Sequence, residues 1–470
     1  MRAERYDLAV IGGGSVGLIA AGFARKIGAR VILLERDRIG GDCTWTGCVP
    51  SKSLLRVAKA ANEMHQAARF GLTPHEPAID MVRVREYLRS TIERIYAGTT
   101  PEALQRKGID VAFGQAAFAD TRHIVIGERR IRARKIIIGT GARPSIPAID
   151  GLDAVPFSTY RDIFENDRLP ARLAVAGGGP IGVEIAQAYQ RLGVRVTMFA
   201  ERLLPKEELE AADIVRNVLQ REGVAIVAER VRSVERRGDA ILVRSDRAEE
   251  QCDMLLVAAG RRPALDGLNL DAAGVRFSDR GIQVNDRLQT SAKHIYAAGD
   301  VLGGPQFSHV AGWQGFQAVR NALLPGSGSG FSSVVPRVTF CDPEVAQAGM
   351  TEAEARAGRA GDIVARSWPI EREDRAVCDD DLDGILKIIT SRKGVILGAT
   401  IVGHRAGEAI MELVLAMKHG ISIDDLAGTM HPYPTYASGV QLLASDMAVD
   451  RALTGPAGFL IRSMSRLSLK

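Results

Sequence analysis

The same glycine motif occurs twice in this chain, and the repeat constrains the fold more than any other feature. The motif reads Gly12-x-Gly14-x-x-Gly17 in the first copy and Gly177-x-Gly179-x-x-Gly182 in the second, 165 residues later. Each copy follows a short apolar stretch that is typical of a buried strand and precedes a stretch that is typical of a helix. A strand, a glycine turn and a helix in this order predict a Rossmann unit, so we expect an α/β fold with two dinucleotide sites.

The first copy has the surroundings that a dinucleotide site requires. Residues Tyr6–Ile11 predict the strand before it, and residues Arg30–Leu34 predict a second strand that ends at Glu35. The glycines permit a tight turn and let the backbone approach a pyrophosphate at the helix N-terminus. Glu35 lies 18 residues after Gly17, where an acidic side chain accepts hydrogen bonds from ribose hydroxyls.

The second copy differs where its second predicted strand ends. Ala200 follows this strand at the position where an NAD site presents an acidic residue, and Glu201 and Arg202 come next. The missing acid and the nearby arginine favour the 2′-phosphate of NADPH. Glu201 can take the part of the acid after a shift of one residue, so NADH stays open as the alternative.

A segment between the two copies carries a pair of cysteines. Cys43 and Cys48 lie five positions apart, and Gly47 precedes the second. This spacing can close a small disulfide ring, because the glycine lets the backbone bend to meet the bond's dihedral angle. Lys52 adds a positive charge that favours a thiolate. Because the segment follows the first dinucleotide unit, we interpret the pair as a redox-active disulfide that exchanges electrons with a bound flavin.

The length and charge of the chain exclude several classes of protein. With 470 residues the chain is too long for one hydrophobic core and is expected to form roughly three domains. The net charge of +5 is spread along the chain, and no basic block interleaved with aromatic residues indicates nucleic-acid binding. No apolar run is long enough to cross a bilayer, and the N-terminus does not resemble a signal peptide.

Cysteine usage predicts a reducing compartment. The chain has five cysteines, an odd and sparse set that does not fit a secreted disulfide framework, so we expect a cytoplasmic protein. Cys252, Cys341 and Cys378 each lie in or beside a segment that resembles a strand, without a partner motif. We therefore expect these three to be buried or incidental rather than chemical.

The pattern of turns predicts that the second Rossmann unit is inserted into the first. The turn at residues 260–263 repeats the turn at residues 139–144, and the apolar segment before Asp300 returns the chain to the first unit. The glycine- and serine-rich stretch at residues 325–330 predicts a linker. The predicted domains are a first dinucleotide-binding domain at 1–150 and 276–330, a second at 151–275, and a C-terminal α+β domain at 334–470.

Individual elements are predicted by their apolar periodicity. We expect helices at Ser51–Ala68 and Gly407–His419, and strands of the C-terminal domain at Pro336–Phe340, Gly384–Thr390 and Val395–Val402. The tail at Phe459–Lys470 is basic and mildly amphipathic. We expect it to be solvated or packed in a dimer, with contact to a membrane surface as the alternative.

Taken in order, these motifs resemble the flavin-dependent pyridine nucleotide–disulfide oxidoreductases, the group that holds dihydrolipoyl dehydrogenase, glutathione reductase and mercuric reductase. The resemblance rests on GGGSVG, GGDCTWTGCVPSK, GGGPIGVE, YAAGD and a C-terminal histidine-proline pair. It covers nearly the whole chain. It implies an NAD(P)H oxidoreductase with two Rossmann-like domains, FAD and a C-terminal dimerisation domain.

The resemblance also implies roles for individual residues. FAD would lie on Gly12, Gly14, Gly17 and Glu35, with Asp300 at its sugar chain, and NAD(P)H would lie on Gly177, Gly179, Gly182 and Arg202. Gly41, Lys52, Gly141 and Gly260 complete the predicted cofactor-binding set. Cys48 matches the thiol that contacts the flavin, Cys43 matches the thiol that attacks substrate, and Lys52 and Glu184 match an ion pair beside the flavin. His431 would serve the thiols of the partner subunit as acid/base in a homodimer with a shared active site.

Departures from the family pattern bear on the substrate. In the disulfide-reducing members a glutamate follows the catalytic histidine by five residues, whereas here that position is Tyr436. We therefore expect either that His431 is a weaker base or that its substrate needs little proton transfer. Tyr433 matches a tyrosine that holds the metal in mercuric reductases and is a tentative substrate residue. The C-terminal cysteine pair of those enzymes is absent, and Pro180 replaces a tyrosine that gates the nicotinamide pocket.

The predicted substrate is therefore a small-molecule disulfide or a metal ion of the mercuric type, and we predict no resident metal site. The first alternative is a dihydrolipoyl dehydrogenase that passes electrons from a dithiol to NAD⁺; the missing glutamate and Ala200 count against it. The second is a redox-sensing or interaction protein that does not turn over. Two intact dinucleotide motifs argue against a sensor, because a sensor does not need a hydride donor.

Overall fold

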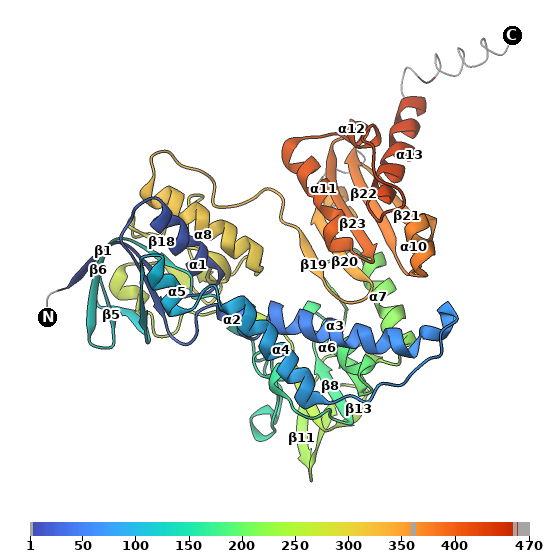
Figure 1. Ribbon diagram of the computed structural model, residues 1–470, viewed down its shortest axis with the longest axis horizontal. Helices are drawn as coiled ribbons and strands as arrows, with labels where there is room; N and C mark the ends of the chain where they lie inside the picture. Colours follow the sequence, from blue (N-terminus) through green and yellow to red (C-terminus); the bar gives the residue numbers. More distant parts are fainter. Residues whose placement is uncertain (1–2, 359–362, 455–457, 459–470) are drawn as a thin grey trace. The chain divides into compact units, whose positions relative to one another are not determined.

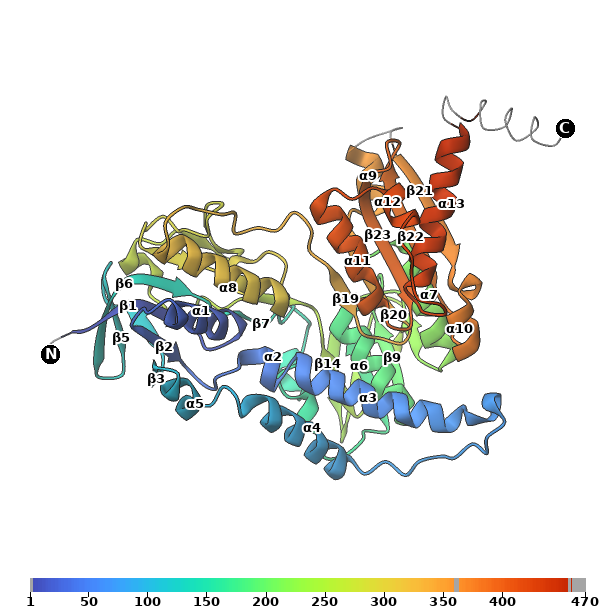
Figure 2. The same ribbon diagram turned by 45° about the horizontal axis from the view of Figure 1, so that its top comes forward.

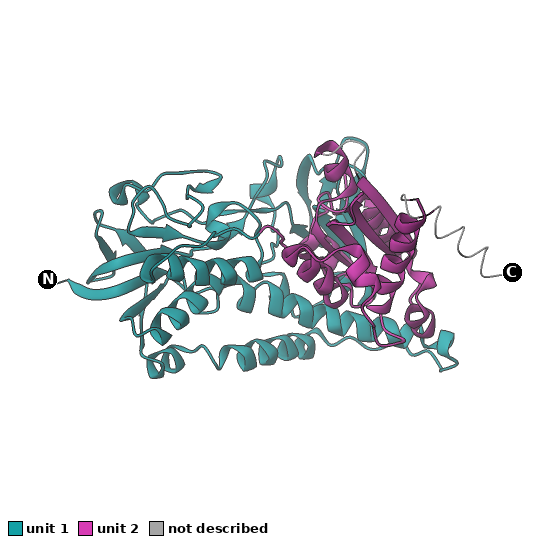
Figure 3. Cartoon of the chain, turned by 90° about the horizontal axis from the view of Figure 1, so that it is seen from above, with its two compact units in different colours: residues 1–177, 188–200, 227–332 teal, residues 178–187, 201–226, 333–470 magenta. Residues whose placement is uncertain are grey.

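A computed structural model describes residues 3–358, 363–454 and 458. By its internal contacts the chain divides into two compact units, which are coloured separately in Figure 3. The first unit comprises residues 1–177, 188–200 and 227–332, and the second comprises residues 178–187, 201–226 and 333–470. Within the described ranges, no helix combines the length and the apolar character that crossing a membrane requires. The predicted amphipathic tail at 459–470 lies outside the described residues.

The first unit alternates strands and helices along its N-terminal half. Its elements up to the second glycine motif are β1 Glu4–Ile11, α1 Ser15–Lys26, β2 Val31–Glu35, α2 Gly41–Trp45, α3 Cys48–His65, α4 Met81–Tyr96, α5 Pro101–Arg106, β3 Ile109–Phe113, β4 Ala116–Phe118, β5 His123–Ile126, β6 Arg129–Ile138, β7 Ala142–Pro144 and β8 Arg172–Ala176, with 3-10 turns at Ala67–Phe70, Leu152–Ala154 and Ile163–Glu165. Helix α6 Pro180–Arg191 starts in the second unit and ends in the first.

The rest of the first unit is mostly strand. Its elements are β9 Arg195–Phe199, β11 Ser233–Arg237, β12 Ala240–Arg244, β13 Glu249–Cys252, β14 Met254–Val257, β15 Arg261–Pro263, β16 Phe277–Ser278, β17 Gly281–Ile282, β18 Ile295–Ala297 and α8 Ser308–Leu323, with 3-10 turns at Leu270–Ala273 and Gly299–Leu302. Strand β10 Ala225–Val227 spans the division between the units.

A seven-stranded sheet forms the base of the first unit. Its order is β3-β2-β1-β6-β5-β4, and β18 pairs with β6 as well. Strands β1, β2, β3, β6 and β18 run parallel, which places their C-terminal ends at one edge. Figures 1 and 2 both show α1 beside α8 on one face of this sheet. Ligands of open parallel sheets bind at the C-terminal edge of the strands, where the first glycine turn lies.

Apolar residues cover both faces of this sheet. Leu8 and Val10 of β1 pack with Val16 of α1 and Ala318 of α8, all of them at most 4% exposed. Their neighbours Ala9 and Ile11 face the opposite side, where the residues of β4 to β6 form a second cluster. This alternation explains why β1 is apolar throughout, because a parallel sheet is buried on both faces.

Two short segments that resemble each other in sequence lie side by side in the first unit. Strand β7 pairs with β15 in antiparallel register, with Arg143 opposite Arg262. The sequence indicated that the turn at residues 260–263 repeats the turn at residues 139–144, as expected if the second Rossmann unit is inserted into the first. The pairing shows in addition that they meet.

The second Rossmann unit has a smaller sheet. Its order is β10-β9-β8-β14, and β14, β8 and β9 run parallel. A three-stranded antiparallel sheet, β11-β12-β13, packs on it through a cluster that includes Val243, Leu255 and Phe199. The strand that leads into the second glycine motif is therefore central in its sheet, as the strand of the first motif is.

The second unit contains an antiparallel sheet with helices. Its elements are α7 Leu209–Arg221, β19 Arg337–Thr339, β20 Glu344–Gly349, α9 Glu352–Gly358, β21 Ile363–Pro369, α10 Asp374–Asp379, β22 Ile385–Ser391, β23 Ile396–Gly403, α11 Ala406–His419, α12 Ile423–Ala427 and α13 Ser438–Thr454, with a 3-10 turn at Ile370–Arg372. The sheet order is β19-β20-β23-β22-β21. Residues of α11 and α13 that include Ile410, Leu413 and Leu443 are fully buried against it.

The structure confirms the α/β class and the predicted C-terminal strands, with shifts at their ends. Two predictions are corrected. The helix expected at Ser51–Ala68 is α3, which begins three residues earlier at Cys48 and ends at His65. Cys378 lies in helix α10 rather than in or beside a strand. The pattern failed there because α10 is only six residues long, too short for a helical period to show.

Candidate functional site

The two cysteines of the segment Gly40–Lys52, which we call the thiol segment, lie on two consecutive helices of the first unit. Cys43 is in the middle of α2, and Cys48 is the first residue of α3. Both are free thiols in the structure, which is the reduced form of the predicted redox pair. Cys48 is exposed and Cys43 is half-buried. The Sγ atom of Cys48 lies 3.2 Å from Oγ of Ser308, the first residue of α8.

The environment gives the two thiols opposite acidities. A hydrogen bond from the Cys43 thiol lowers the pKa of Cys48 to about 6, with help from Ser308 and from the charge of Lys52, although partial loss of water around the sulfur opposes this. The same hydrogen bond raises the pKa of Cys43 well above its usual range, and burial raises it further. The position of Cys48 at the N-terminus of α3 also favours an anion. The surroundings therefore favour a thiolate at Cys48 and a protonated thiol at Cys43.

Two close approaches of the backbone shape the first glycine turn. Gly12 has φ +105°, and a Cβ atom there would lie 2.4 Å from the carbonyl oxygen of Gly139. A Cβ atom on Gly17 would lie 1.9 Å from the carbonyl oxygen of Gly12, so the start of α1 can approach the turn only with glycine. Glu35 Oε2 accepts a hydrogen bond of 2.6 Å from the amide of Gly13 and so faces this turn.

A cleft of about 950 Å³, counted with its open side, lies above this turn in the first unit. The predicted site residues that line it are Gly12, Gly14, Glu35, Gly41, Cys43, Gly141 and Asp300. Gly41 approaches Gly14 so closely that a Cβ atom would lie 2.8 Å from the Gly14 Cα atom. The cleft thus joins the glycine turn to the thiol segment, as the sequence predicted for a flavin nucleotide.

A buried charge network, which the sequence did not predict, crosses the cleft. Arg261 Nη2 lies 2.7 Å from Asp300 Oδ2 and 3.9 Å from Asp42 Oδ2. Tyr160 donates a hydrogen bond of 2.8 Å to Asp42. Burial raises the pKa of Asp300, and the charge of Arg261 opposes this rise. Asp300 therefore lies at the cleft as expected, but it is already paired with an arginine.

These features fit FAD. The Nε atoms of Arg261 and Arg143, both residues of the cleft wall, are buried and have no hydrogen-bond partner among the described atoms. Unpaired cationic donors beside a glycine turn suit a pyrophosphate, and a carboxylate at the end of β2 suits a ribose. When bound, FAD would be held by the glycine turn and Glu35 at its nucleotide end and would reach the thiols at its other end.

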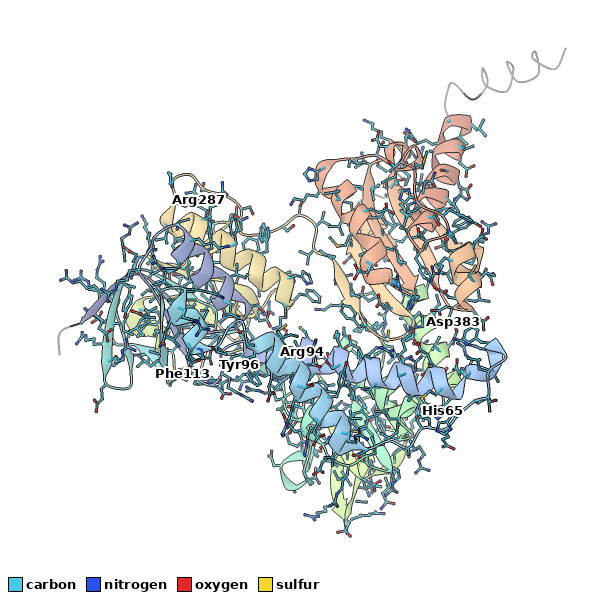
Figure 4. All side chains as sticks on the ribbon, viewed as in Figure 1. His65, Arg94, Tyr96, Phe113, Arg287 and Asp383 are labelled. Carbon is cyan, nitrogen blue, oxygen red and sulfur yellow. The ribbon has the colours of Figure 1, made fainter. Side chains whose placement is uncertain are left out.

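Trp45, between the two cysteines, holds the thiol segment in place. Its Nε1 atom donates a hydrogen bond of 2.7 Å to the carbonyl oxygen of Ile39. Its ring meets the ring of Tyr96 edge-on, with 5.0 Å between the centroids; Tyr96 is labelled at the end of α4 in Figure 4. The guanidinium of Arg38 lies 4.5 Å from the centre of the Trp45 ring. These contacts give this tryptophan a structural role.

The second glycine motif lies where the chain passes between the units. Gly177 belongs to the first unit, whereas Gly179 and Gly182 belong to the second. Gly177 has φ +135°, and a Cβ atom there would lie 2.4 Å from the carbonyl oxygen of Ala258. This approach repeats that of Gly12 to Gly139 in the first motif. Around Gly179, by contrast, a Cβ atom would meet nothing within 4 Å.

The residues expected to accompany the second motif have different surroundings. Ala200 is buried, and Glu201 and Arg202 are exposed. Gly260 has φ +116°, in the left-handed region that favours glycine. Glu184 of α6 is buried, and its carboxylate accepts a hydrogen bond of 2.9 Å from the amide of Phe340 within the second unit. Lys52 belongs to the first unit, and its predicted pairing with Glu184 stays a prediction.

The segment 428–437 of the second unit, which we call the histidine loop, connects α12 to α13 and carries His431. The Nε2 atom of His431 lies 2.6 Å from Oε2 of Glu412 on α11, and its Nδ1 atom lies 2.9 Å from the carbonyl oxygen of Thr429. The sequence motif lacks a glutamate for His431, yet the fold supplies a carboxylate from another helix. The hydrogen bond to Glu412 raises the pKa of His431, although burial opposes the rise.

Two tyrosines of the histidine loop contact α10. Tyr433 donates a hydrogen bond of 2.6 Å to Asp374, and Tyr436 donates one of 2.9 Å to Asp379. The residue that occupies the expected glutamate position, Tyr436, therefore does not contact His431 through its hydroxyl. The hydrogen bond to Asp374 raises the pKa of Tyr433.

A further cluster has ligand chemistry that the sequence did not reveal. Ligand atoms of Asp342, Asp381 and His404 all lie within 4.8 Å of one another in the second unit, a spacing that can hold a metal ion. The three residues are separated in the chain by 39 and 23 positions, so no short motif marks them.

Family models match most of the chain. The model described as pyridine nucleotide-disulphide oxidoreductase matches residues 6–315, and the dimerisation domain of the same family matches residues 335–444. A mercuric reductase of Lysinibacillus sphaericus is 34% identical over 450 residues, which cover 94% of this chain and 82% of the relative. A dihydrolipoyl dehydrogenase of Thermus scotoductus is 34% identical over 456 residues, with 93% and 96% covered.

Solved structures agree with these relatives. The HOCl-induced flavoprotein disulfide reductase RclA from Escherichia coli is 29% identical, with a TM-score of 0.85, and the match covers 94% of this chain and 99% of RclA. A Cu(II) complex of RclA matches with a TM-score of 0.84 at 29% identity, over 93% of this chain and 99% of RclA.

Proposed function

This chain belongs to the pyridine nucleotide-disulphide oxidoreductase family, whose members use FAD and NAD(P)H, and we propose that its Cys43–Cys48 pair passes electrons from NAD(P)H to a small disulfide or a thiol-binding metal ion. The single observation that carries this proposal is the division of acidity within the pair. The contact between the two thiols lowers the pKa of Cys48 and raises the pKa of Cys43, with Ser308 and Lys52 also lowering that of Cys48. One poised thiolate and one protonated thiol are what a dithiol reductant needs.

When bound, FAD supplies the chemistry that passes two electrons from a hydride donor to a disulfide. The residues of the chain hold the other parts of the reaction. We assign Gly12, Gly14, Gly17, Gly41, Gly141, Glu35 and Asp300 to FAD binding. Cys48, with Lys52 and Ser308 stabilising its charge, is the thiol that faces the cofactor, and Cys43 is the thiol that meets substrate.

For a disulfide substrate the step balances as two exchanges. The Cys43 sulfur, after giving up its proton, attacks one substrate sulfur and releases the first substrate thiolate, which takes that proton. The Cys48 thiolate then attacks the Cys43 sulfur and releases the second substrate thiolate, so that the Cys43–Cys48 disulfide forms and the substrate gains two electrons. A soft metal ion such as Hg(II) would instead be bound by the two thiolates. It would take up two electrons and leave as the element as the two sulfurs join in the Cys43–Cys48 disulfide.

We favour a metal ion among the possible substrates. Mercuric reductases are among the relatives that align over nearly the whole chain, and RclA has a solved Cu(II) complex. A dihydrolipoyl dehydrogenase is the second candidate, because a relative of that name aligns over 96% of its own length at 34% identity. It would run the same thiols in reverse, from a dithiol to NAD⁺.

The test is turnover by the purified, FAD-loaded enzyme. We would measure NADPH oxidation with Hg(II) in excess thiol, and NAD⁺ reduction with dihydrolipoamide in parallel, with Cys43→Ser as the control. Thiol-dependent oxidation with Hg(II) that Cys43→Ser loses supports the metal-ion substrate. Rapid NAD⁺ reduction by dihydrolipoamide would instead favour the second candidate, and no NAD(P)H-dependent turnover with any disulfide or metal ion would contradict the proposal.

For the hydride donor we propose NADPH bound on Gly177, Gly179 and Gly182, with Gly260 completing the site. Support comes from Ala200, which is buried and offers no carboxylate, and from Arg202, which is exposed and free to meet a phosphate dianion. The ratio of kcat/KM for NADPH and NADH tests this. Arg202→Ala is expected to lower the ratio, whereas a clear NADH preference of the wild-type enzyme would contradict the assignment.

The chain carries the dimerisation domain of its family, which supports a homodimer. We propose that the active site is shared, with the histidine loop of one subunit serving the thiols of the other through His431 or Tyr433.

The proposed domains are FAD-binding residues 1–150 and 276–330, NAD(P)-binding residues 151–275 and dimerisation residues 334–470. We also propose that Glu184 pairs with Lys52 beside the flavin. We propose a cytoplasmic location, which the sparse cysteines support.

A further inference from the structure

The histidine loop carries two titratable side chains with opposite exposure. The side chain of His431 is only 7% exposed, whereas Tyr433 is 72% exposed. The residue before the histidine, Met430, is 93% exposed, so the loop as a whole lies at the surface of the second unit. The loop therefore turns its imidazole inward and its phenol outward.

Both nitrogens of the imidazole have acceptors within the second unit. The carbonyl oxygen of Thr429 can only accept, and so can the carboxylate of Glu412 when it is ionised. Both contacts, at 2.9 Å and 2.6 Å, are therefore satisfied together by a doubly protonated His431. In this arrangement neither nitrogen is left to exchange a proton with a substrate.

The phenol of Tyr433 is in the opposite situation. Its hydroxyl donates to Asp374 at 2.6 Å, and the rest of the side chain is open to solvent. A phenol oxygen with one donated hydrogen bond still has lone pairs that can meet an approaching cation or thiol. Of the two titratable side chains His431 and Tyr433, Tyr433 is thus the one that a ligand outside the second unit can reach.

Glu412 holds the first half of this loop from a rigid support. It lies on α11 between Ile410 and Leu413, both of which are fully buried in the core of the second unit. The second half of the loop has its own anchor, the hydrogen bond from Tyr436 to Asp379. Tyr433 lies between these two fixed points.

We propose that Glu412 is a positioning residue, which through His431 fixes the histidine loop so that the Tyr433 phenol meets the substrate at the thiols of the partner subunit. This inference rests on the proposed function, because it assumes that the loop serves those thiols. It assigns the proton-exchanging or ligand-contacting role within the loop to Tyr433 and an anchoring role to His431.

The test uses the full-length, FAD-loaded dimer with Glu412→Gln, which keeps the shape of the side chain but removes its charge. Glu408→Gln is the matched control, because Glu408 lies one turn earlier on the same helix and is exposed. Two electron acceptors are tried with the wild-type enzyme: Hg(II) in excess thiol and a small aromatic disulfide. The one that the enzyme reduces is used for the variants. Because misplacement of a positioned group by about 1 Å costs up to about 100-fold, we expect Glu412→Gln to lower kcat/KM roughly tenfold. Glu408→Gln should leave it unchanged.

Two further readouts separate positioning from general damage. The anaerobic rate at which NADPH reduces the flavin should be the same in Glu412→Gln as in the wild type, because the loop takes no part in that half-reaction. Hydrogen exchange of the backbone amides of residues 429–431, 433, 435 and 436 should be faster in Glu412→Gln and unchanged in Glu408→Gln. Unchanged exchange in Glu412→Gln, or a slowed flavin reduction, would overturn the proposal.

A double-mutant cycle tests whether Glu412 acts through Tyr433. Tyr433→Phe should lower kcat/KM by itself, and the double variant Glu412→Gln with Tyr433→Phe should be no slower than Tyr433→Phe alone. If the two losses multiply in full, or if Tyr433→Phe retains wild-type turnover, Glu412 does not act through this phenol. If the wild-type enzyme reduces neither acceptor, the proposed function fails, while hydrogen exchange still tests the anchor.

Discussion

The thiol segment and the histidine loop carry different kinds of chemical site. In the thiol segment the two sulfurs and the lysine lie within ten residues of one another, on the consecutive helices α2 and α3. In the histidine loop the important partner of His431 is Glu412, which lies 19 residues earlier on another helix. The thiol segment can be recognised as a sequence motif. The pairing of His431 with Glu412 forms only because α11 packs beside the histidine loop.

This difference also shows in what each site does to protons. The thiol segment separates the acidities of two similar groups, so that one proton remains between Cys43 and Cys48. The histidine loop instead keeps a proton on one group, because both acceptors around His431 favour its charged form. Two thiols of different acidity suit electron transfer to a substrate. A histidine that keeps its positive charge suits the role of an anchor for the loop.

The largest expected effect lies in the thiol segment. Cys43→Ser should lower turnover with the acceptor by at least about 1000-fold, since the loss of a nucleophile that acts in a unit removes nearly all of its catalysis. Flavin reduction by NADPH should persist. We would compare steady-state turnover with anaerobic single-turnover reduction in the same preparation; wild-type turnover in the variant would remove Cys43 from the electron path.

The acidity of Cys48 is the next test. In the two-electron-reduced enzyme, the long-wavelength absorbance that a thiolate gives beside a flavin should appear as pH rises, with a midpoint near the pKa of about 6. Ser308→Ala removes a hydrogen bond to this sulfur, so the midpoint should rise. Cys48→Ser should abolish the band at every pH, and its persistence would mean that another group gives rise to it.

The pH dependence of stability tests whether His431 keeps its proton in the folded histidine loop. The pKa of His431 is raised in the fold, so its stabilising contribution is complete below the ordinary histidine value of about 6.5 and is lost as pH rises through the folded value. The wild-type Tm should exceed that of His431→Gln by about 2–4 °C at pH 6, and the gap should close towards pH 9. A gap that widens with pH would show that the imidazole is neutral in the fold.

The smallest effect is expected at Cys378, a thiol outside both sites. It is exposed on α10 and was predicted to be incidental. Cys378→Ser should change kcat/KM by less than about twofold and leave the titration of Cys48 unaltered, because serine replaces an exposed thiol with a group of similar size. Paired assays of the variant and the wild type would check this; a marked loss would reveal a third thiol in the electron path.

Local patterns predicted much of the fold and of the cleft. The strands before both glycine motifs, the helix that follows the first and Glu35 at the end of β2 lie where the sequence indicated. The prediction succeeded because a Cβ atom at Gly12, Gly17 or Gly177 would clash with a neighbouring backbone carbonyl, so these positions require glycine. Asp300 was also found at the cleft, since a short apolar strand delivers it there.

The partners of these residues were not predicted. Arg261 at Asp300, Ser308 at Cys48 and Glu412 at His431 are separated from them by 39, 260 and 19 residues. None of these partners stands at a fixed spacing, and a single arginine, serine or glutamate carries no local signal. The cluster of Asp342, Asp381 and His404 was missed for the same reason.

The sequence by itself determined the two Rossmann units, the cysteine pair and the lysine that follows it, because backbone sterics and short-range spacing act within a few residues. Only the tertiary structure decided which charges face these groups. It put Ser308 beside the Cys48 sulfur, Arg261 beside Asp300 and Glu412 beside His431. Acidity depends on distance in space, and packing of helices and strands from remote parts of the chain sets that distance.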